Sequence, residues 1–502
     1  MLLAAFTDIV KSDSGISDSK RTSLSDRIRP YLFDIDYEDQ AEAAPPKLFL
    51  KEDSGRCFYQ NALHLTNAGG RPNGRYKSVK SIKNHLALYS QLIQEWNDAT
   101  DPDTRERKYE QLFVAITTHL HLVEVECTGK INEFQVFESL NGKGVNLTAI
   151  DRIKSIYLSL ARRDNDSGIS NWQSLYSELD IARDTNKVDN KLLHFFISLF
   201  FSLDGKRINK HELPDRFKTM ANECNLSFQE FDSKLQDAAK TYGAIRNATT
   251  GDMQTDAILK EIKELGQEQI YVPLYAASTA FPYNSDAFRK IANKLLVYSV
   301  RFSICGKPAN ILDGEFAKMI SLMRVNHDLS KTLAYIESRT SQDDIFRDSF
   351  ARFSTTNSSF AKYLLKKIER EMRIAEGNNN PVPDDPTLEH IIPQQLNFID
   401  WFGRDNMPET AVLDSFKEDY ITRIGNMVLL NQSNNSKASN KDYQSKRSVY
   451  LNGAGGANPE KPANTYILVS QLVKDYDETF GINEIDDRSK KLAGYAVKIW
   501  HG

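Results

Sequence analysis

The stretch Pro386-Thr387-Leu388-Glu389-His390-Ile391-Ile392-Pro393-Gln394 is the most informative part of this 502-residue chain. It is a short run of β-prone residues closed by proline, which predicts an extended segment. Side chains alternate across such a segment, so we expect Glu389 and His390 on opposite faces. A second β-prone run, Ile424-Gly425-Asn426-Met427-Val428-Leu429-Leu430, leads into Asn431 to Asn440, which is predicted to be a loop. The order strand, loop, strand, helix is that of a small module able to gather a base and a metal ion around one phosphate.

The residue types in this module suit phosphodiester hydrolysis. That reaction needs a base to activate water and a cation to stabilise charge on the phosphoryl oxygens. Histidine has an ordinary pKa of about 6.5, so His390 would be available as a neutral base near pH 7. Mg²⁺ prefers oxygen ligands and is held by one or two protein groups, which Glu389 and Asn435 would supply. On chemistry alone, the alternative is that His390 is an ordinary strand histidine and Glu389 its solvated neighbour.

Several segments in the right order resemble the HNH (His-Me finger) domain catalogued as domain of unknown function 1524. They are Glu-His-Ile-Ile-Pro-Gln, Ile-Gly-Asn-Met-Val-Leu-Leu, Asn435 and the Lys446 to Tyr450 segment. The resemblance implies that His390 is the general base and Asn426 the structural asparagine that braces the loop. It also implies that Glu389 and Asn435 lie at a bound Mg²⁺ or another divalent cation. Asparagine stands where some HNH enzymes have a final histidine, and three others compete with Asn435 for this role: Asn431, Asn434 and Asn440.

A second informative segment, Asn132 to Leu160, contains Phe137-Glu138-Ser139-Leu140-Asn141-Gly142-Lys143-Gly144-Val145-Asn146-Leu147. On spacing alone it is a turn followed by a helix, with Thr148 as N-cap and Asp151 as capping-box acid. The segment also resembles domain of unknown function 262. Together the two domains are typical of GmrSD-type, modification-dependent (type IV) restriction endonucleases and related phage-defence nucleases. The resemblance implies a set of nucleotide-binding residues: Asn141, Gly144, Asp151 and Lys154.

Those enzymes usually carry an Asp-Gly-Gln-Gln-Arg motif near their start, tied to nucleotide binding and hydrolysis. In the family an apolar helix much like Met1 to Val10 follows that motif, and the motif itself does not occur in this chain. We therefore expect the chain to begin just after it and NTP to bind only if the missing motif is supplied. The missing motif argues against NTP hydrolysis by this chain. The alternative is hydrolysis through residues outside that motif.

The charge balance leaves DNA contact to local basic patches. Hydrophobic residues make up 40% and charged residues 26% of the chain, and the net charge is -4, so there is no global attraction to nucleic acid. Backbone contacts are expected from basic residues near the module: Lys437, Lys441, Lys446 and Arg447. The predicted amphipathic helix from Ser358 to Ile374 has a second basic set, for which a solvated face is expected and DNA contact is the alternative: Lys366, Lys367, Arg370 and Arg373.

Three further patterns bear on location and on the helical regions. The cysteines, at Cys57, Cys127, Cys224 and Cys305, lack zinc or redox spacing and fit a reducing cytoplasm. The N-terminus lacks the basic region of a signal peptide. Leu192 to Leu203 is too short to cross a bilayer and predicts a buried helix, so no membrane partner is expected.

Periodicity completes the pattern of elements. Ser78 to Thr100 predicts an amphipathic helix, and Val114 to Cys127 predicts a strand. His119 and His121 share a face of that strand, and without a third ligand a structural role is expected for both. The region from Trp172 to Phe346 is mostly helical without a fixed repeat.

These patterns predict a cytoplasmic, mainly α (α+β) protein with a C-terminal ββα-metal module. Its predicted domains are a remnant ParB-like/NTPase sensing domain (1–165), a helical middle domain (166–345) and an HNH nuclease domain (346–502). The predicted activity is metal-dependent cutting or nicking of modified or foreign double-stranded DNA, with a homo-oligomer or a partner subunit left open. The alternative is a non-catalytic DNA-binding or scaffold protein with a decayed nuclease module.

Overall fold

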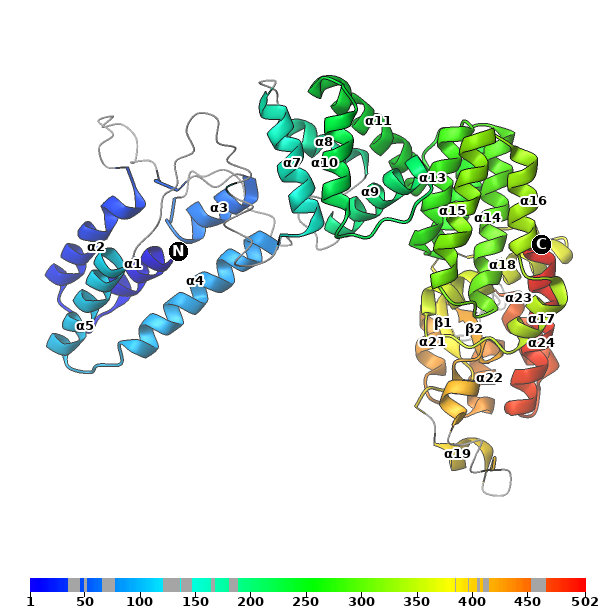
Figure 1. Cartoon of the computed structure of the whole chain (residues 1–502). Helices are drawn as coiled ribbons and strands as arrows, with labels where there is room; N and C mark the ends of the chain where they lie inside the picture. Colours follow the sequence, from blue (N-terminus) through cyan, green and yellow to red (C-terminus); the bar gives the residue numbers. More distant parts are fainter. Residues whose placement is uncertain are drawn as a thin grey trace. The chain divides into compact units, whose positions relative to one another are not determined.

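The computed structural model consists almost entirely of helices (Figure 1). It describes residues 1–34, 46–48, 52–65, 77–120, 136, 147–163, 168–179, 188–383, 385–395, 397–403, 407–409, 415–452 and 466–502. Across these residues there is one sheet, formed by two antiparallel strands in the C-terminal part. The predicted mainly helical fold with a small β component is therefore confirmed.

The chain forms two compact units. The first comprises Met1–Asn146 with Ile181–Asn190, and the second comprises Leu147–Asp180 with Lys191–Gly502. The division into domains 1–165, 166–345 and 346–502 stays a prediction.

The first unit is a cluster of helices around an apolar core. Its elements are α1 (Leu2–Ser12), α2 (Asp18–Leu32), α3 (Glu52–Asn61), α4 (Lys77–Trp96), α5 (Pro102–Val114) and the π-helical turn η1 (Ala115–His119). Phe6 and Val10 of α1 pack with Leu24 of α2 and Tyr109 of α5 in that core. The apolar N-terminal helix and the amphipathic helix after Ser78 are confirmed.

The strand predicted from Val114 to Cys127 is wrong over its first part. Val114 is the last residue of α5, and the backbone N–H of Ala115 donates to the carbonyls of the preceding turn. The helix therefore continues through His119, and this hydrogen bonding outweighs the local β-branched composition. His121 and Cys127 lie outside the described residues.

The second unit begins with helices that pack pairwise. They are α7 (Ala149–Arg163), α8 (Gly168–Glu178), α9 (Val188–Asp204), α10 (Leu213–Glu223), α11 (Phe228–Asn247), α12 (Met253–Leu265), η2 (Glu268–Ile270), α13 (Tyr271–Ala280), α14 (Asp286–Ile304), α15 (Asn310–Asn326), α16 (Leu329–Arg339) and α17 (Asp343–Ala351). Leu192, Phe195 and Phe196 of α9 are fully buried, as predicted for this apolar helix. Within the described part of the chain, no helix has both the length and the apolar character needed to cross a membrane.

The C-terminal part of this unit holds the sheet. Its elements are α18 (Ser358–Ala375), β1 (Thr387–His390), α19 (Phe398–Phe402), η4 (Lys417–Ile421), η5 (Ile424–Asn426), β2 (Met427–Leu430), α21 (Gln432–Ala438), α22 (Tyr443–Asn452), α23 (Ile467–Asp475) and α24 (Ile482–Ile499). The strand register pairs Thr387 with Leu430 and His390 with Met427. The strands lie next to α18, α21 and α23 in Figure 1. The helix after Ser358 is as predicted.

The asparagine-rich segment predicted to be a loop forms the short helix α21. Asn431 is its N-cap, and the side-chain oxygen accepts a hydrogen bond from the Asn434 backbone N–H at 2.8 Å. Asparagine is among the preferred N-cap residues, so the composition that suggested a loop instead starts a helix.

Candidate active site

His390 is the last residue of β1 and faces away from Glu389. Its imidazole is half-buried, and Nε2 lies 3.3 Å from the side-chain nitrogen of Gln394, within hydrogen-bond reach. Burial and, to a smaller extent, the nearby Lys446 ammonium lower the pKa of His390 to about 4. The imidazole is therefore neutral at pH 7, which is the form that can take a proton.

Asn426 holds the turn that follows His390. The Asn426 side chain is fully buried, and its oxygen accepts from the Ile392 backbone N–H at 2.7 Å. Its amide nitrogen donates to the carbonyls of Ile392 and Ile421, both at 3.0 Å. The backbone carbonyl of Asn426 also accepts from the Ile391 N–H at 2.8 Å. The side chain contacts only backbone groups, so it can position His390 but not touch a reacting atom.

Glu389 points to the opposite side of the strand and forms a buried ion pair. Its carboxylate accepts from Lys446 Nζ at 2.5 Å and from the Tyr450 hydroxyl at 3.3 Å. Lys446 Nζ also donates to the His390 carbonyl at 2.7 Å. Glu389 is 6% and Lys446 1% exposed. Burial raises the pKa of Glu389 and lowers that of Lys446, and their mutual attraction opposes both changes.

This ion pair corrects two expectations about the module. Lys446 cannot contact a DNA phosphate in this arrangement, because its ammonium is buried and bound to Glu389 and His390. Glu389 is not a solvated neighbour of His390 either. Lys446 and Tyr450 are one helical turn apart on α22, so their side chains lie on the same face of that helix. This spacing was the sign in the sequence that both side chains could contact one residue, here Glu389.

Asn435 joins α21 to the first strand. Its side-chain nitrogen donates to Thr387 Oγ1 at 2.8 Å and to the Leu388 carbonyl at 3.1 Å. Of the competing asparagines, Asn431 caps α21 through its side chain, as described above. Asn435 is thus placed beside β1, with its amide nitrogen already used.

The residues expected to hold a divalent cation do not form a ligand set here. In the part of the chain that the structure describes, no three His, Cys, Asp or Glu side chains are grouped as metal ligands. The charge of Glu389 is balanced by Lys446, and the strand places His390 on the other face.

The basic residues expected at DNA divide into exposed and engaged groups. Lys437 and Lys441 are exposed, whereas Arg447 is half-buried and donates to the Val473 carbonyl at 3.1 Å. The basic face of α18 is also engaged: Lys366 and Lys367 form ion pairs with Glu264 and Glu261 of α12. Lys366 and Lys367 therefore face α12. The structure shows neither the solvated face nor the DNA-contacting face that the sequence suggested for them.

Arg488 of α24 is a structural residue that the sequence did not reveal. Its guanidinium is buried and donates to the carbonyls of Gly425 at 2.7 Å and Met427 at 2.8 Å. It thereby fixes the junction of η5 and β2 that carries Asn426. Arg488 lies in a run of charged residues that is typical of a solvated helix face, so sequence offered no signal for this role.

The predicted nucleotide-binding residues are only partly described. Asp151 accepts from the Thr148 backbone N–H at 3.0 Å and hydroxyl at 2.8 Å, and its own N–H donates to Thr148 Oγ1 at 3.2 Å. The predicted capping box is therefore confirmed. Lys154 lies on α7 and is half-buried. Asn141 and Gly144 lie outside the described residues, so the nucleotide role of the four residues stays a prediction.

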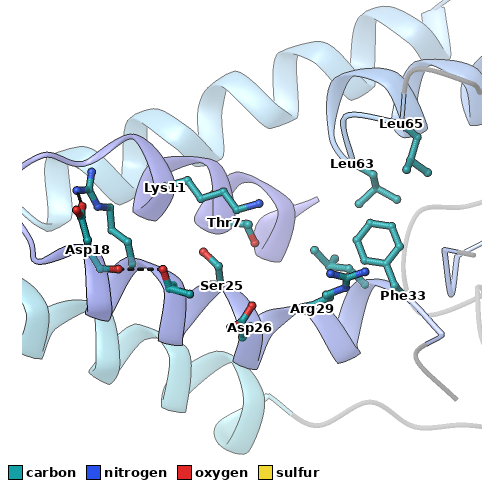
Figure 2. Close-up of a pocket in the computed structure, with 12 residues that line it drawn as sticks. Thr7, Lys11, Asp18, Ser25, Asp26, Arg29, Phe33, Leu63 and Leu65 are labelled. Carbon is teal, nitrogen blue, oxygen red and sulfur yellow. Dashed lines mark hydrogen bonds and ion pairs between the residues drawn. The ribbon is translucent and has the colours of Figure 1, made fainter. Parts of the chain in front are cut away.

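The first unit contains a pocket of about 620 Å³ that the sequence did not predict (Figure 2). Figure 2 shows Thr7 and Lys11 of α1 opposite Ser25 and Arg29 of α2. Phe33, Leu63 and Leu65 line its other end, and Asp18 forms an ion pair with Arg21 at its rim. The walls therefore combine hydroxyl, cationic and acidic groups, the last from Asp18 and Asp26, with an apolar end.

Residues 340–495 match the family model described as GmrSD restriction endonucleases, C-terminal domain. The match covers about a third of the chain and includes both strands, Glu389, His390 and Asn426. It implies a nuclease domain of a restriction endonuclease and therefore a DNA substrate. The resemblance of 132–160 to domain of unknown function 262 is not detected. A search of the curated proteins gives no match.

Proposed function

We propose that the segment from residue 340 onward is the cutting domain of a restriction endonuclease and hydrolyses DNA with His390 as general base. The observation that carries this proposal is the neutral imidazole of His390 within the matched segment, held by a turn that Asn426 braces. His390 would take a proton from water as the water oxygen attacks phosphorus, and the P–O bond to the leaving oxygen would break.

The low pKa of His390 fits this role when substrate is considered. A base with a pKa of about 4 is weak in the free protein. A bound phosphodiester carries a negative charge, and a negative charge nearby favours the protonated imidazolium. Substrate would therefore raise the pKa of His390 toward neutrality, and the base would become stronger in the complex than in the free protein.

The finer assignments follow from the sequence resemblance. The substrate would be modified or foreign double-stranded DNA, and the module would be of the HNH, ββα-metal type. Residues 1–165 would form the sensing or regulatory domain, and NTP would bind there if the missing motif is supplied. Asn435 would be the third motif residue, and Lys437 and Lys441 would contact the DNA backbone because both are exposed.

Phosphodiester hydrolysis calls for a cation to stabilise the charge on the phosphoryl and leaving oxygens. We propose Mg²⁺ or another divalent cation for this role. Glu389 is paired with Lys446 in the free protein, so it would have to leave that ion pair to hold the cation.

A plasmid-nicking assay with Mg²⁺ tests the role of His390. We expect the wild type to convert supercoiled plasmid to open circles and His390→Ala to be slower by roughly 10²- to 10⁴-fold, the usual contribution of a general base. His211→Ala is the matched control, because His211 is exposed and distant in sequence from the module. Equal cleavage by wild type and His390→Ala would exclude His390 as the base.

The second candidate function is a non-catalytic DNA-binding or scaffold protein. The ion pair between Glu389 and Lys446 favours it, because the residue expected at the metal is neutralised by a lysine. DNA binding without cleavage by the wild type, over a range of divalent cations, would support this second function.

A further inference from the structure

A basic pocket lies in the second unit, inside the segment that matches the nuclease family. It has a volume of about 490 Å³ and is formed by α17, the residue after it, η4 and α24. Its walls carry four basic and two acidic side chains: Arg347, Arg352, Arg423, Lys490, Asp348 and Asp486. Four positive charges thus face two negative charges.

Arg423 is the fixed member of this set. Its guanidinium lies 3.4 Å from the Asp486 carboxylate and donates to the Asp419 carbonyl at 2.9 Å. It also stacks on the ring of Tyr420, with 5.4 Å to the ring centroid. Asp486 is therefore neutralised within the pocket.

The other three cations are less constrained. Arg347, Arg352 and Lys490 are exposed. The pKa of Asp487 is lowered by its hydrogen bond with Lys491 and, to a smaller extent, by the Lys490 charge. Asp487, beside Lys490 in the sequence, is already bound by Lys491 at 2.9 Å and by the Tyr476 hydroxyl at 2.7 Å. Three exposed cations, with Asp348 in the pocket and Asp487 shared between Lys490 and Lys491, leave a local excess of positive charge, which attracts anions.

The pocket is built on the segments that hold the candidate base. Arg423 is the N-cap of η5, which ends at Asn426, the brace of the turn after His390. Arg488, two residues before Lys490 on α24, donates to the carbonyls of Gly425 and Met427. The pocket and that turn therefore share the residues of η5 and α24.

We propose that this pocket binds the phosphate backbone of duplex DNA through Arg347, Arg352 and Lys490. The proposal rests on the proposed nuclease function. The cations are exposed and come from two helices, which suits a polyanion with phosphates at regular intervals. A free phosphate or nucleotide would instead need donors that surround one group. Backbone contacts carry no sequence information, so the pocket sets the register of DNA without selecting its sequence.

Binding of a labelled DNA duplex, followed by anisotropy over a range of salt concentrations, tests the proposal. All proteins carry His390→Ala so that the DNA stays intact. The test variant is Arg352→Ala/Lys490→Ala, and the control is Lys218→Ala/Lys318→Ala, which removes the same charge from exposed sites elsewhere in the unit. The logarithm of the binding constant falls by about 0.9 per phosphate contact for each tenfold rise in salt.

Loss of two contacts should therefore make the plot of the logarithm of the binding constant against the logarithm of the salt concentration less steep by about 1.8. If the affinities converge near 1 M salt, the affinity at about 0.1 M salt should fall by roughly 60-fold. The loss should be the same for unrelated DNA sequences. The control should bind like its parent. Asp348→Asn should bind more tightly than the parent, because it removes the one unpaired acid of the pocket.

The outcomes separate this proposal from the proposed function. An unchanged slope in the Arg352→Ala/Lys490→Ala variant, with cleavage intact in the wild type, overturns the pocket assignment alone. A reduced slope without cleavage by the wild type supports the pocket and counts against the nuclease. Displacement of DNA by ATP or inorganic phosphate beyond the effect of sodium chloride at equal ionic strength would make the pocket a small-anion site and overturn the DNA assignment. Failure of the parent to bind DNA overturns the pocket assignment, and absence of cleavage by the wild type counts separately against the nuclease.

Discussion

Lys446 is the residue on which the candidate active site depends most. Its ammonium neutralises Glu389 on one face of β1 and holds the His390 carbonyl on the strand itself. A charge buried with a partner is tolerated, whereas a charge buried alone is costly. The position of His390 thus depends on the ion pair of Lys446 with Glu389 on the opposite face of β1.

Replacing Lys446 by methionine should destabilise the protein by about 3–5 kcal/mol, because Glu389 is left buried without its cation. Urea unfolding followed by circular dichroism measures the change. Lys441→Met, at an exposed lysine nearby, should shift the unfolding free energy by less than about 0.5 kcal/mol. The double variant Glu389→Gln/Lys446→Met should recover part of the loss. A single variant as stable as the wild type would mean that the ion pair contributes nothing.

The lowered pKa of His390 predicts a pH dependence of stability. The pKa is about 4 in the folded protein and about 6.5 in the unfolded chain, so the unfolded state binds its proton first as pH falls. The stabilisation is present above about pH 6.5 and is lost toward pH 4, by an amount on the order of 2–3 kcal/mol. Unfolding free energies at several pH values between these limits should fall less steeply for His390→Gln than for the wild type. Parallel profiles would contradict the assignment.

At the scale of elements, the contact of η5 with α24 sets the shape of the site. A Cβ atom built on Gly425 would lie 2.2 Å from Ser489 Oγ and 2.3 Å from the Ile485 carbonyl oxygen. The close approach lets Arg488 reach the carbonyls on either side of Asn426. A glycine is required here for space.

Gly425→Ala should therefore lower stability by about 1–3 kcal/mol, since a backbone carbonyl cannot move aside as a side chain can. Gly494→Ala is the matched control on the same α24 helix. Nothing lies within 4 Å of its added Cβ, so the change should instead stabilise by roughly 0.5–1 kcal/mol. Thermal unfolding of both variants measures the contrast, and a neutral effect of Gly425→Ala would show that α24 can move away.

The elements also show what sequence could and could not predict. The apolar run at Leu192, the amphipathic helix after Ser358 and the two strands that include His390 and Met427 follow from local sequence patterns, and the structure has them. The strand expected after Val114 fails because α5 continues through it, and the asparagine loop fails because Asn431 starts a helix. In both cases the hydrogen bonds of a helix, those that continue α5 and the N-cap of α21, outweighed the amino-acid composition of the segment.

At the scale of the whole molecule, the net charge of -4 hides a local excess of positive charge. The basic pocket draws its residues from α17, η4 and α24, which are far apart in the sequence. Similarly, Glu389 meets Lys446 only because α22 packs beside the strand. Apart from the spacing of Lys446 and Tyr450, no local pattern predicts such contacts. His390 could therefore be proposed as a base from the sequence, and the basic pocket could not.

The ion pair of Glu389 with Lys446 predicts how the free protein responds to metal. Adding Mg²⁺ without DNA should leave the thermal midpoint unchanged, because Lys446 already binds the Glu389 carboxylate that would hold the ion. Removing divalent cations with EDTA should stop plasmid nicking while leaving DNA binding in place. A rise of the midpoint with Mg²⁺ alone would reveal a preformed metal site.

The hydrogen bonds from Arg488 to the carbonyls of Gly425 and Met427 also bear on when the site forms during protein synthesis. The ribosome makes His390 and both strands well before it makes α24. Until α24 emerges and docks, the turn beside His390 lacks the guanidinium that fixes its carbonyls. A nascent chain would therefore carry an unfinished site. The site proposed to cut DNA would therefore reach its final form only after α24 has docked.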